Sequence, residues 1–163
     1  MLKLESLSVK LSKKSSPLFS IDSVHEPGTL TWIRGTSGSG KSTLLRVISG
    51  LQKPTSGTVN IFGHDLWSSS SRNRDKFRAK SMGIVFQDSG VVPCLTIDEN
   101  LSFAQGLSGV TADSDANSSL LAQLNMSDYG ASLPHELSVG QRQRAAIACL
   151  LYTSDAADEE DSV

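Results

Sequence analysis

The stretch Gly35 to Thr43 reads GTSGSGKST and decides how this chain is interpreted. It matches the pattern G-x-x-x-x-G-K-[ST] and lies between a β-prone run, Thr29–Arg34, and a run with helical spacing, Lys41–Ser49. Glycines let backbone amides point inward around a phosphate chain, and a helix start adds the positive end of its dipole. A chance glycine turn before a helix is the alternative, and the strand–loop–helix context argues against it. The sequence therefore predicts a nucleotide-phosphate site.

Each position of this loop has a predicted role. Lys41 supplies a positive charge for the β- and γ-phosphates, and the Ser42 hydroxyl is placed to ligate Mg²⁺. The remaining positions contribute backbone amides or close the turn. The predicted nucleotide ligands are Gly35, Thr36, Ser37, Gly38, Ser39, Gly40, Lys41, Ser42 and Thr43.

Composition narrows the class of protein. The chain has 163 residues, of which 38% are hydrophobic and 20% charged, enough for one domain with a core. The net charge of −2 argues against a broad nucleic-acid surface. Two cysteines cannot form a disulfide framework, which fits a reducing compartment. The N-terminus lacks the apolar run of a signal peptide, and no apolar stretch approaches the ~20 residues that cross a bilayer. We expect a cytoplasmic chain that does not span the membrane itself.

The remaining pattern alternates strands with helices, which predicts an α/β architecture. Gly50 is placed to end the helix that follows the loop, because glycine enters the left-handed conformation cheaply. The serine-rich stretch Trp67–Asp75 shows no periodicity and predicts a surface loop. Further strands are expected at Leu2–Val9, Thr58–Phe62 and Ser81–Phe86, and further helices from the Thr96/Glu99 capping box, over Ser119–Asn125, and from the Ser138/Gln141 capping box through Ala148.

Two more motifs narrow the use of the nucleotide. Gln87 directly follows the run SMGIVF, and Leu137–Gln141 reads LSVGQ, continuing as RQRAAIA. With the loop, and in this order, they make Met1 to Ala148 resemble the ATP-binding cassette family, the ATPase subunits of ABC transporters. The resemblance implies the fold of a P-loop NTPase: a RecA-like α/β core, an antiparallel β subdomain and a helical signature subdomain.

The resemblance also implies roles for residues beyond the loop. Gln87 would be the catalytic glutamine that senses Mg²⁺ and the attacking water and couples both to the transport subunit. Ser138, Gly140 and Gln141 would face the γ-phosphate held by the opposite subunit of a head-to-tail dimer. Taken alone, Gln87 would be a polar residue at a strand end and Ser138 an ordinary helix cap.

ATP and Mg²⁺ are therefore the expected cofactors. The expected partners are a transmembrane permease and a second ATPase subunit, identical or different, and no nucleic acid. The expected location is the cytoplasmic face of the inner membrane, as a peripheral subunit.

Local stretches are similar to the lipoprotein-releasing and macrolide-exporter branch, although the pattern also occurs in amino-acid importers. These stretches are Phe77–Asp88, Val91–Leu101 and Pro134–Arg144. Two positions depart from the family. The usual adenine-stacking aromatic falls near Leu11, with Phe19 the nearest aromatic, and Val139 replaces the first glycine of the usual LSGGQ.

The chain changes character after Ala148. The family continues with a hydrophobic strand ending in Asp-Glu, whereas this chain reads CLLYTSDAADEEDSV from Cys149. No β-prone run precedes Asp158 and Glu159, so they are not taken as that pair. The string CLLYTSDAADE matches an in-frame translation of a transposase adapter used in sequencing libraries. We expect an incomplete ATP-binding domain over 1–148 and a non-native tail over 149–163; the alternative is a genuine acidic, disordered tail.

The leading interpretation is the ATP-binding subunit of an ABC transporter, which hydrolyses ATP when full-length to drive a membrane permease. One rival is a soluble cassette ATPase without a membrane partner, acting in translation or DNA repair. The other is a non-catalytic, truncated fragment. Such a fragment would bind nucleotide weakly and hydrolyse it poorly, because the acid and base that the chemistry needs would be absent.

Overall fold

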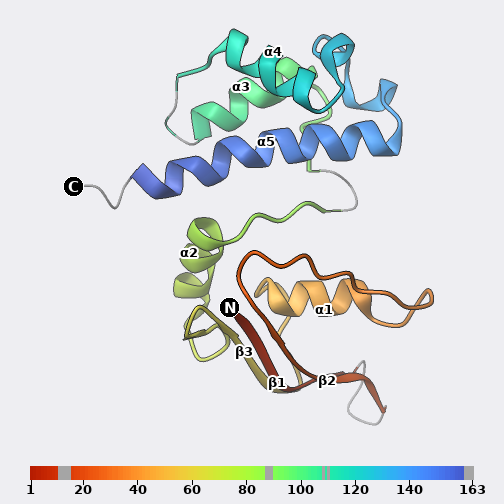
Figure 1. The fold of residues 1–163 in the computed structure, drawn as a ribbon, viewed down its shortest axis with the longest axis vertical. Coiled ribbons are helices and arrows are strands. Elements are labelled where there is room, and N and C mark those ends of the chain that lie inside the picture. The colour runs from red at the N-terminus through yellow and green to blue at the C-terminus, as the bar shows by residue number, and fades with distance from the viewer. Residues whose placement is uncertain (11–15, 87–89, 108, 110, 160–163) are drawn as a thin grey trace. The chain divides into compact units, whose positions relative to one another are not determined.

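The computed structural model describes residues 1–10, 16–86, 90–107, 109 and 111–159, with only the helical backbone given for 153–159. These residues form two compact units, Met1–Arg78 and Ala79–Val163 (Figure 1). The strands are β1 (Leu2–Lys10), β2 (Pro17–His25), β3 (Ser56–Ile61) and β4 (His64–Asp65). The helices are α1 (Lys41–Ile48), α2 (Ser71–Ser81), α3 (Ile97–Leu107), α4 (Ser114–Gln123) and α5 (Val139–Glu159), with 3₁₀ turns η1 (Ser127–Tyr129) and η2 (Pro134–Glu136).

The N-terminal unit is built on an antiparallel sheet of order β2-β1-β3-β4. The apolar residues of β1 turn into the core, where α1 contributes Leu44 and Val47. The predicted strands Leu2–Val9 and Thr58–Phe62 are confirmed to within two residues at each end. Gly50 has φ +73° immediately after α1, so the predicted glycine stop is also confirmed.

The predicted strand Thr29–Arg34 is wrong, because no regular strand forms there. Within the described chain, no backbone hydrogen bond holds Leu30 to Arg34, and the Leu30 side chain is 99% exposed. The run has the β-propensity of a strand, but a strand also needs a neighbour that supplies its hydrogen bonds. None of the described strands of this unit pairs with it.

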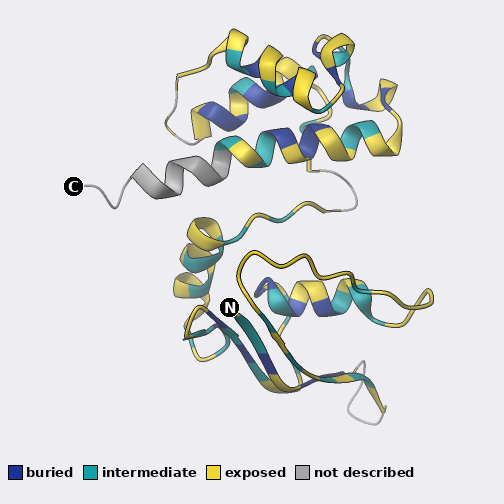
Figure 2. Ribbon diagram, viewed as in Figure 1, coloured by how far each residue is buried: buried dark blue, intermediate teal, exposed yellow. Residues whose placement is uncertain are grey.

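Two further predictions are corrected around α2. The stretch Trp67–Asp75 is not all loop, since α2 begins at Ser71, where the Ser70 hydroxyl accepts a hydrogen bond from the Asn73 amide at 3.3 Å. No residue of α2 is fully buried, which is why its sequence carries no apolar periodicity (Figure 2). Ser81–Phe86 is not a buried strand: Ser81 ends α2, and Phe86 is 48% exposed.

The C-terminal unit packs α3, α4 and α5 around one apolar cluster. Its buried members are Ile97, Leu101, Leu121, Met126, Leu137, Ala145 and Ala148. The Thr96/Glu99 capping box is confirmed: the Thr96 amide donates to Glu99 Oε2 at 2.7 Å, and the Glu99 amide donates to Thr96 Oγ1 at 3.3 Å. The helix expected over Ser119–Asn125 starts earlier, because Asp113 accepts two amide hydrogen bonds and caps α4.

The last helix also runs further than predicted. The expected end at Ala148 is wrong, because α5 continues to Glu159. Cys149 and Tyr152 pack against the helical cluster, since they extend the apolar side of α5 by one more turn. Burial raises the pKa of the Cys149 thiol to about 11. In the part of the chain that the structure describes, no helix combines the length and apolarity needed to span a bilayer.

Candidate nucleotide-binding site

The glycine-rich loop folds as a tight turn that leads into α1. The Ser39 amide donates to the Thr36 carbonyl at 3.3 Å, and Gly38 has φ +78° at the third position of this turn. Gly40 follows as the N-cap of α1 with φ +90°. Both glycines occupy the left-handed region, which other residues enter only at a cost. Alternation of such residues with ordinary ones is how a backbone builds an anion nest.

The start of α1 is open. Gly40 offers no side-chain cap, and within the described chain no hydrogen bond occupies the amides of Lys41, Ser42 and Thr43. Helices normally satisfy these first amides with a capping side chain, water or a ligand. The three amides carry the positive end of the helix dipole, so the loop presents a receptor for an anion.

The Lys41 ammonium lies on its own loop. Its Nζ donates to the Gly35 carbonyl at 2.9 Å and to the Thr36 carbonyl at 2.8 Å. The cation is thus held by two neutral acceptors, and none of the described acidic side chains forms an ion pair with it. A phosphate that enters the loop would replace these two neutral acceptors with charged ones, which is a favourable exchange for an ammonium group.

Apolar side chains form the wall behind the loop. A Cβ placed on Gly40 would lie 2.7 Å from Leu18 Cδ2 and 3.0 Å from Phe19 Cδ1. Gly40 is therefore required by space as well as by its φ angle. Phe19, the nearest aromatic in the sequence argument, sits half-buried beside the loop on β2. The position near Leu11 lies outside the described residues.

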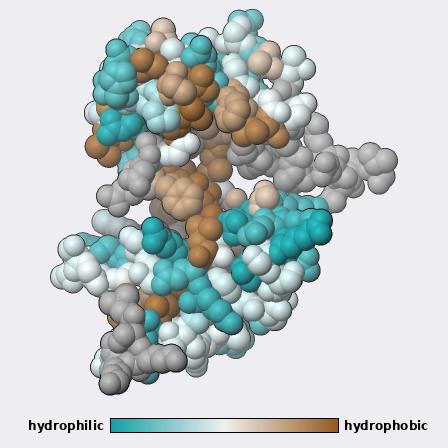
Figure 3. Space-filling model, turned by 180° about the vertical axis from the view of Figure 1, so that it is seen from behind, coloured by the Kyte–Doolittle hydropathy of each residue, from teal (hydrophilic) through white to brown (hydrophobic). Residues whose placement is uncertain are grey.

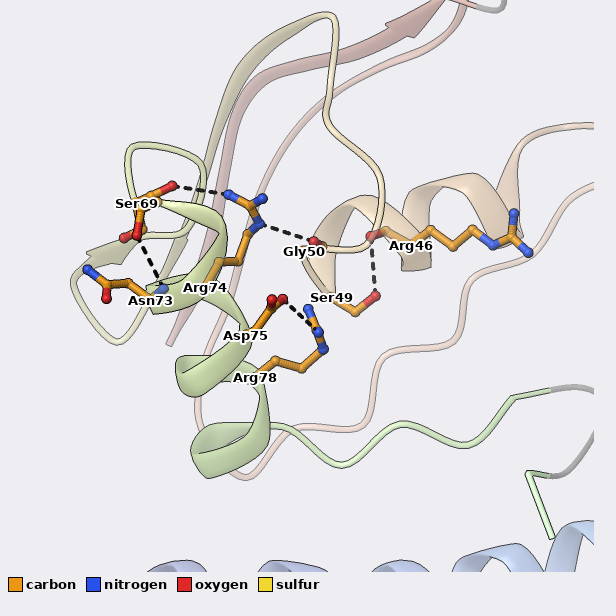
Figure 4. Close-up of polar contacts among 9 residues, drawn as sticks. Arg46, Ser49, Gly50, Ser69, Asn73, Arg74, Asp75 and Arg78 are labelled. Atoms are coloured by element: carbon orange, nitrogen blue, oxygen red, sulfur yellow. Dashed lines mark hydrogen bonds and ion pairs between the residues drawn. The ribbon is translucent and has the colours of Figure 1, made fainter. Parts of the chain in front are cut away.

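The other end of α1 is held by residues that the sequence argument missed. Trp67 Nε1 donates to the Val47 carbonyl at 3.2 Å, and Arg74 Nε donates to the Gly50 carbonyl at 3.2 Å. Figure 4 shows Arg74 reaching from α2 to Gly50 and to Ser69. The Arg74 guanidinium also lies 4.5 Å from the centre of the Trp67 ring. These donors satisfy carbonyls that a helix end leaves free and so fix the helix that carries the phosphate loop.

The second predicted motif is a capped helix start. Ser138 Oγ accepts from the Gln141 amide at 3.3 Å, and Gln141 Oε1 accepts from the Ser138 amide at 2.8 Å. The predicted capping box is therefore confirmed. Ser138, Val139 and Gly140 are exposed, and nothing lies within 4 Å of a Cβ placed on Gly140. Arg142, which the sequence argument did not single out, donates to the Pro134 and Leu137 carbonyls and fixes the approach to α5.

The structure therefore gathers the predicted residues into two groups. Gly35–Thr43 belongs to the N-terminal unit, and Ser138, Gly140 and Gln141 belong to the C-terminal unit. Gln87 lies outside the described residues. Its flanking segment is anchored by Asn100, which is 3% exposed, accepts from the Val92 amide at 2.7 Å and donates to the Val92 carbonyl at 3.1 Å. Asn100 was also missed; the signal in the sequence was an asparagine at helical spacing from the apolar residues Ile97 and Ala104, on the side of α3 that is buried.

The donor set around the loop fits Mg²⁺ only together with a nucleotide. The Ser42 side chain is exposed, and its hydroxyl makes no hydrogen bond within the described chain. Among the residues that the structure describes, no three His, Cys, Asp or Glu side chains come together to hold a metal. Mg²⁺ keeps several waters and commonly binds through one or two protein oxygens plus substrate phosphates, which is what one free hydroxyl at a phosphate loop can support.

An open helix start, a glycine nest and a lysine at its mouth define the phosphate-binding loop of P-loop nucleotide-binding proteins. Comparison with known proteins identifies the family within this class. The family model described as ABC transporter matches residues 19–156, and the chain belongs to this family.

Curated relatives of this chain are named as ATP-binding proteins of transport systems. The uncharacterized ABC transporter ATP-binding protein Rv0986 of Mycobacterium tuberculosis is 43% identical over 125 residues, covering 76% of this chain and 50% of the relative. The lipoprotein-releasing system ATP-binding protein LolD 1 of Rhodopirellula baltica is 37% identical over 124 residues, covering 75% and 54%. The chain thus spans about half the length of the curated relatives it matches.

Solved structures agree with this assignment. The dimeric structure of MJ0796, a bacterial ABC transporter cassette, superposes with a TM-score of 0.77 at 30% identity, covering 94% of this chain and 70% of that one. Its post-hydrolysis state bound to ADP and Pi superposes with a TM-score of 0.78 at 29% identity, with the same coverage. The predicted family and fold class are confirmed: the chain has the α/β P-loop fold of an ABC transporter cassette, with an antiparallel sheet.

Proposed function

We propose that Gly35–Thr43 binds the triphosphate of ATP with Mg²⁺, as the ATP-binding part of an ABC transporter subunit. The observation that carries this proposal is the open start of α1: three amides without a partner among the described residues, and the Lys41 ammonium on the same loop. Membership of the family supports ATP as the nucleotide. The open helix start supports phosphate binding at this loop, because such a helix end favours an anion.

In this proposal the loop's own groups do the binding. The amides of Lys41, Ser42 and Thr43 donate to phosphate oxygens, and Lys41 Nζ leaves the Gly35 and Thr36 carbonyls for the β- and γ-phosphates. The Ser42 hydroxyl, and by family resemblance Gln87, would hold Mg²⁺, which neutralises charge on the phosphates. The apolar wall of Leu18 and Phe19 excludes water from the back of the loop.

The second half-site completes a dimer in this proposal. The Ser138 oxygen accepts from the Gln141 amide, which leaves the hydroxyl hydrogen of Ser138 free to donate to a phosphate. The exposed amides of Val139 and Gly140 add the positive end of the α5 dipole. An identical or different subunit would supply this surface. The ATP-binding subunit would lie at the cytoplasmic face of the inner membrane, and closing of the dimer would drive a transmembrane permease. A soluble cassette ATPase remains the rival, and a permease gene beside this one would decide against it.

ATP hydrolysis is proposed for the longer protein rather than for this chain alone. The Asp-Glu pair that the resemblance requires after a hydrophobic strand does not occur within residues 1–148. We therefore propose 1–148 as the cassette sequence and 149–163 as a foreign tail. An independently sequenced clone should diverge from this sequence after the codon for Ala148. The same codons in that clone would instead establish a genuine acidic tail.

A thermal melt tests nucleotide binding directly. A ligand that binds only the native state raises the melting temperature, by an amount that grows with its concentration over Kd. Mg–ATP should raise the Tm, and AMP at the same concentration should not, because AMP lacks the β- and γ-phosphates that the loop holds. Equal shifts with ATP and AMP, or none with either, would contradict the assignment of the loop.

A further inference from the structure

The helix α2 concentrates positive charge. It holds five of the chain's 15 lysines and arginines within 11 residues, together with one carboxylate, Asp75. Arg72, Lys76 and Lys80 recur at intervals of four residues, and all three are exposed. Side chains four residues apart lie on the same face of a helix, one turn above the other. These three cations therefore form one stripe along α2, called the basic stripe below.

The opposite side of α2 holds the helix on the N-terminal unit. The Phe77 ring stacks on the His64 ring, with 4.7 Å between the ring centres. Arg74 donates to the Gly50 carbonyl at 3.2 Å. Both Phe77 and Arg74 are half-buried, in contrast to the residues of the stripe. Because these contacts fix the rotation of the helix about its axis, the basic stripe is held facing outward.

The basic stripe has no counter-charge on its own helix. Asp75 forms an ion pair with Arg78, whose Nη2 lies 2.9 Å from Asp75 Oδ1, so these two charges offset each other (Figure 4). Arg72 and Lys76 form neither a hydrogen bond nor an ion pair with the residues that the structure describes. A helix face that contacts only water commonly mixes both signs, with acidic and basic residues four positions apart. A stripe of one sign instead favours an anionic surface.

The basic stripe also lacks apolar anchors. None of the exposed large apolar side chains of the described chain belongs to α2. Figure 3 shows apolar side chains over the helical unit, where Leu107 is 68% exposed. Interfaces between proteins usually centre on apolar or aromatic anchors and are poor in lysine. A partner that is recognised by charge alone therefore fits the stripe better than a folded protein does.

The stripe does not depend on what packs against the apolar faces of the unit. Lysine and arginine are almost never fully buried unless they are paired. Burying three cations side by side would carry a large desolvation cost. The stripe is therefore a surface feature, unlike an exposed apolar side chain, which another segment readily covers.

We propose that the basic stripe of α2 lies against the anionic phospholipid headgroups of the membrane beside which the transporter works. The choice of a bilayer rests on the proposed function, because a transporter subunit operates next to one, whereas the charge and exposure of the stripe do not. Headgroup phosphates attract lysine and arginine within one Debye length, about 8 Å at physiological salt. A cluster without apolar anchors adsorbs without inserting, so the contact is weak and reversed by salt. It orients the N-terminal unit beside the bilayer.

Co-sedimentation of the full chain with lipid vesicles tests this contact without nucleotide. The chain should bind vesicles that contain phosphatidylglycerol and should not bind vesicles of phosphatidylcholine alone. It should be released at about 0.5 M salt, where the Debye length is roughly 4 Å. Arg72→Glu/Lys76→Glu reverses two charges of the stripe and should lower the vesicle partition coefficient about tenfold or more. Arg72→Lys/Lys76→Arg should bind as wild type does, because attraction to the headgroups depends on charge rather than on the shape of the cation.

The matched control is Lys10→Glu/Arg46→Glu, which changes the net charge equally at two exposed cations of the same unit outside α2. It should stay within about threefold of wild type in vesicle binding. Equal binding to both kinds of vesicle overturns the proposal, as does an equal loss in the two charge-reversed variants. Binding to duplex DNA that is as tight as to the anionic vesicles, and is lost in Arg72→Glu/Lys76→Glu, also overturns it. Melting curves show that each variant is folded, and their shift with Mg–ATP reports separately on the phosphate loop.

Discussion

The starts of α1 and α5 are the two helix ends that we propose to face the nucleotide, and they are built differently. At α5 a reciprocal box satisfies the amides of Ser138 and Gln141 with each other's side chains. At α1 the cap is Gly40, with no side chain to donate or accept, and a lysine follows it at once. The start of α5 is capped by its own side chains, whereas the start of α1 has no capping side chain and can accept a ligand.

The difference explains why only one of these ends should bind ATP by itself. A glycine at the N-cap costs a helix only a few tenths of a kcal/mol, roughly, relative to a Ser or Asp cap, so leaving α1 without a capping side chain costs little stability. In return the amides of Lys41, Ser42 and Thr43 stay available, and a cation is already in place. The α5 end keeps only the Ser138 hydroxyl hydrogen and two exposed amides, which suits a surface that closes over a phosphate already bound elsewhere.

The substitution Lys41→Ala should have the largest effect on ATP binding at the start of α1. Removing the cation should weaken ATP binding by about 100-fold or more, because a charge-assisted bond to phosphate is worth roughly 1.5–3 kcal/mol and, in the proposed complex, Lys41 would contact two phosphates. Titration with a fluorescent ATP analogue measures the affinity. Lys53→Ala is the matched control, since Lys53 is an exposed lysine of the same unit outside the loop. Unchanged affinity in Lys41→Ala would remove the loop from the site.

Substituting the two glycines of the loop separates strain from crowding. Gly40→Ala should cost about 1–3 kcal/mol of stability and weaken ATP binding roughly tenfold, because φ +90° and contact with Leu18 and Phe19 both oppose a Cβ. Gly38→Ala meets nothing within 4 Å and carries strain alone, so its loss should be smaller. Melting curves and nucleotide titration of both variants measure the difference. Equal losses would show that the apolar wall plays no part.

The contrast between the two helix starts was largely readable in the sequence. Motif spacing placed Lys41 and Ser42 at a helix start and Ser138 at another, because capping and glycine conformations are local properties. The same local logic found the box at Thr96 and the stop at Gly50. Local rules work where the residues that satisfy the backbone lie within one turn of one another.

What could not be predicted depended on distant partners. The β-propensity of Thr29–Arg34 was real, but strand formation required a neighbour that the unit does not supply. The helix α2 buries no residue, so it left no apolar period, and its Arg74 clamp on Gly50 spans 24 positions. Asn100 likewise fixes Val92 through a loop whose course the sequence does not encode locally.

The α5 end can be tested for the opposite outcome. Ser138→Ala should destabilise the chain by about 1 kcal/mol through loss of the cap, while ATP affinity of the single chain stays within about twofold. Thermal melts and nucleotide titration measure the two effects on one sample. In the full-length protein, Ser138→Arg should keep ATP binding but prevent ATP-induced dimers. A loss of ATP affinity much larger than twofold in the single-chain Ser138→Ala variant would mean that the start of α5 binds nucleotide without a second subunit.

Exchanging glutamate and glutamine between the two capping boxes should give the smallest change in Tm. The Thr96 amide and hydroxyl, as hydrogen-bond donors, hold the pKa of the Glu99 carboxyl below its ordinary value. A lowered folded-state pKa contributes stability that is fully present above the unfolded-state value, about 4.3, and is lost as pH falls through the folded-state value. Glu99→Gln should therefore lower the Tm slightly at pH 7, and the gap from wild type should close as the pH falls below 4.

The reciprocal substitution, Gln141→Glu, tests the same effect at the start of α5. Gln141→Glu places a carboxylate in the α5 box, where it would accept from the Ser138 amide and face the dipole of α5. Its Tm should rise relative to wild type near neutral pH and converge with it in acid. Melts of both variants from pH 3 to 7 should thus show gaps of opposite sign that close together. Parallel, pH-independent gaps would mean that packing rather than charge distinguishes the two boxes.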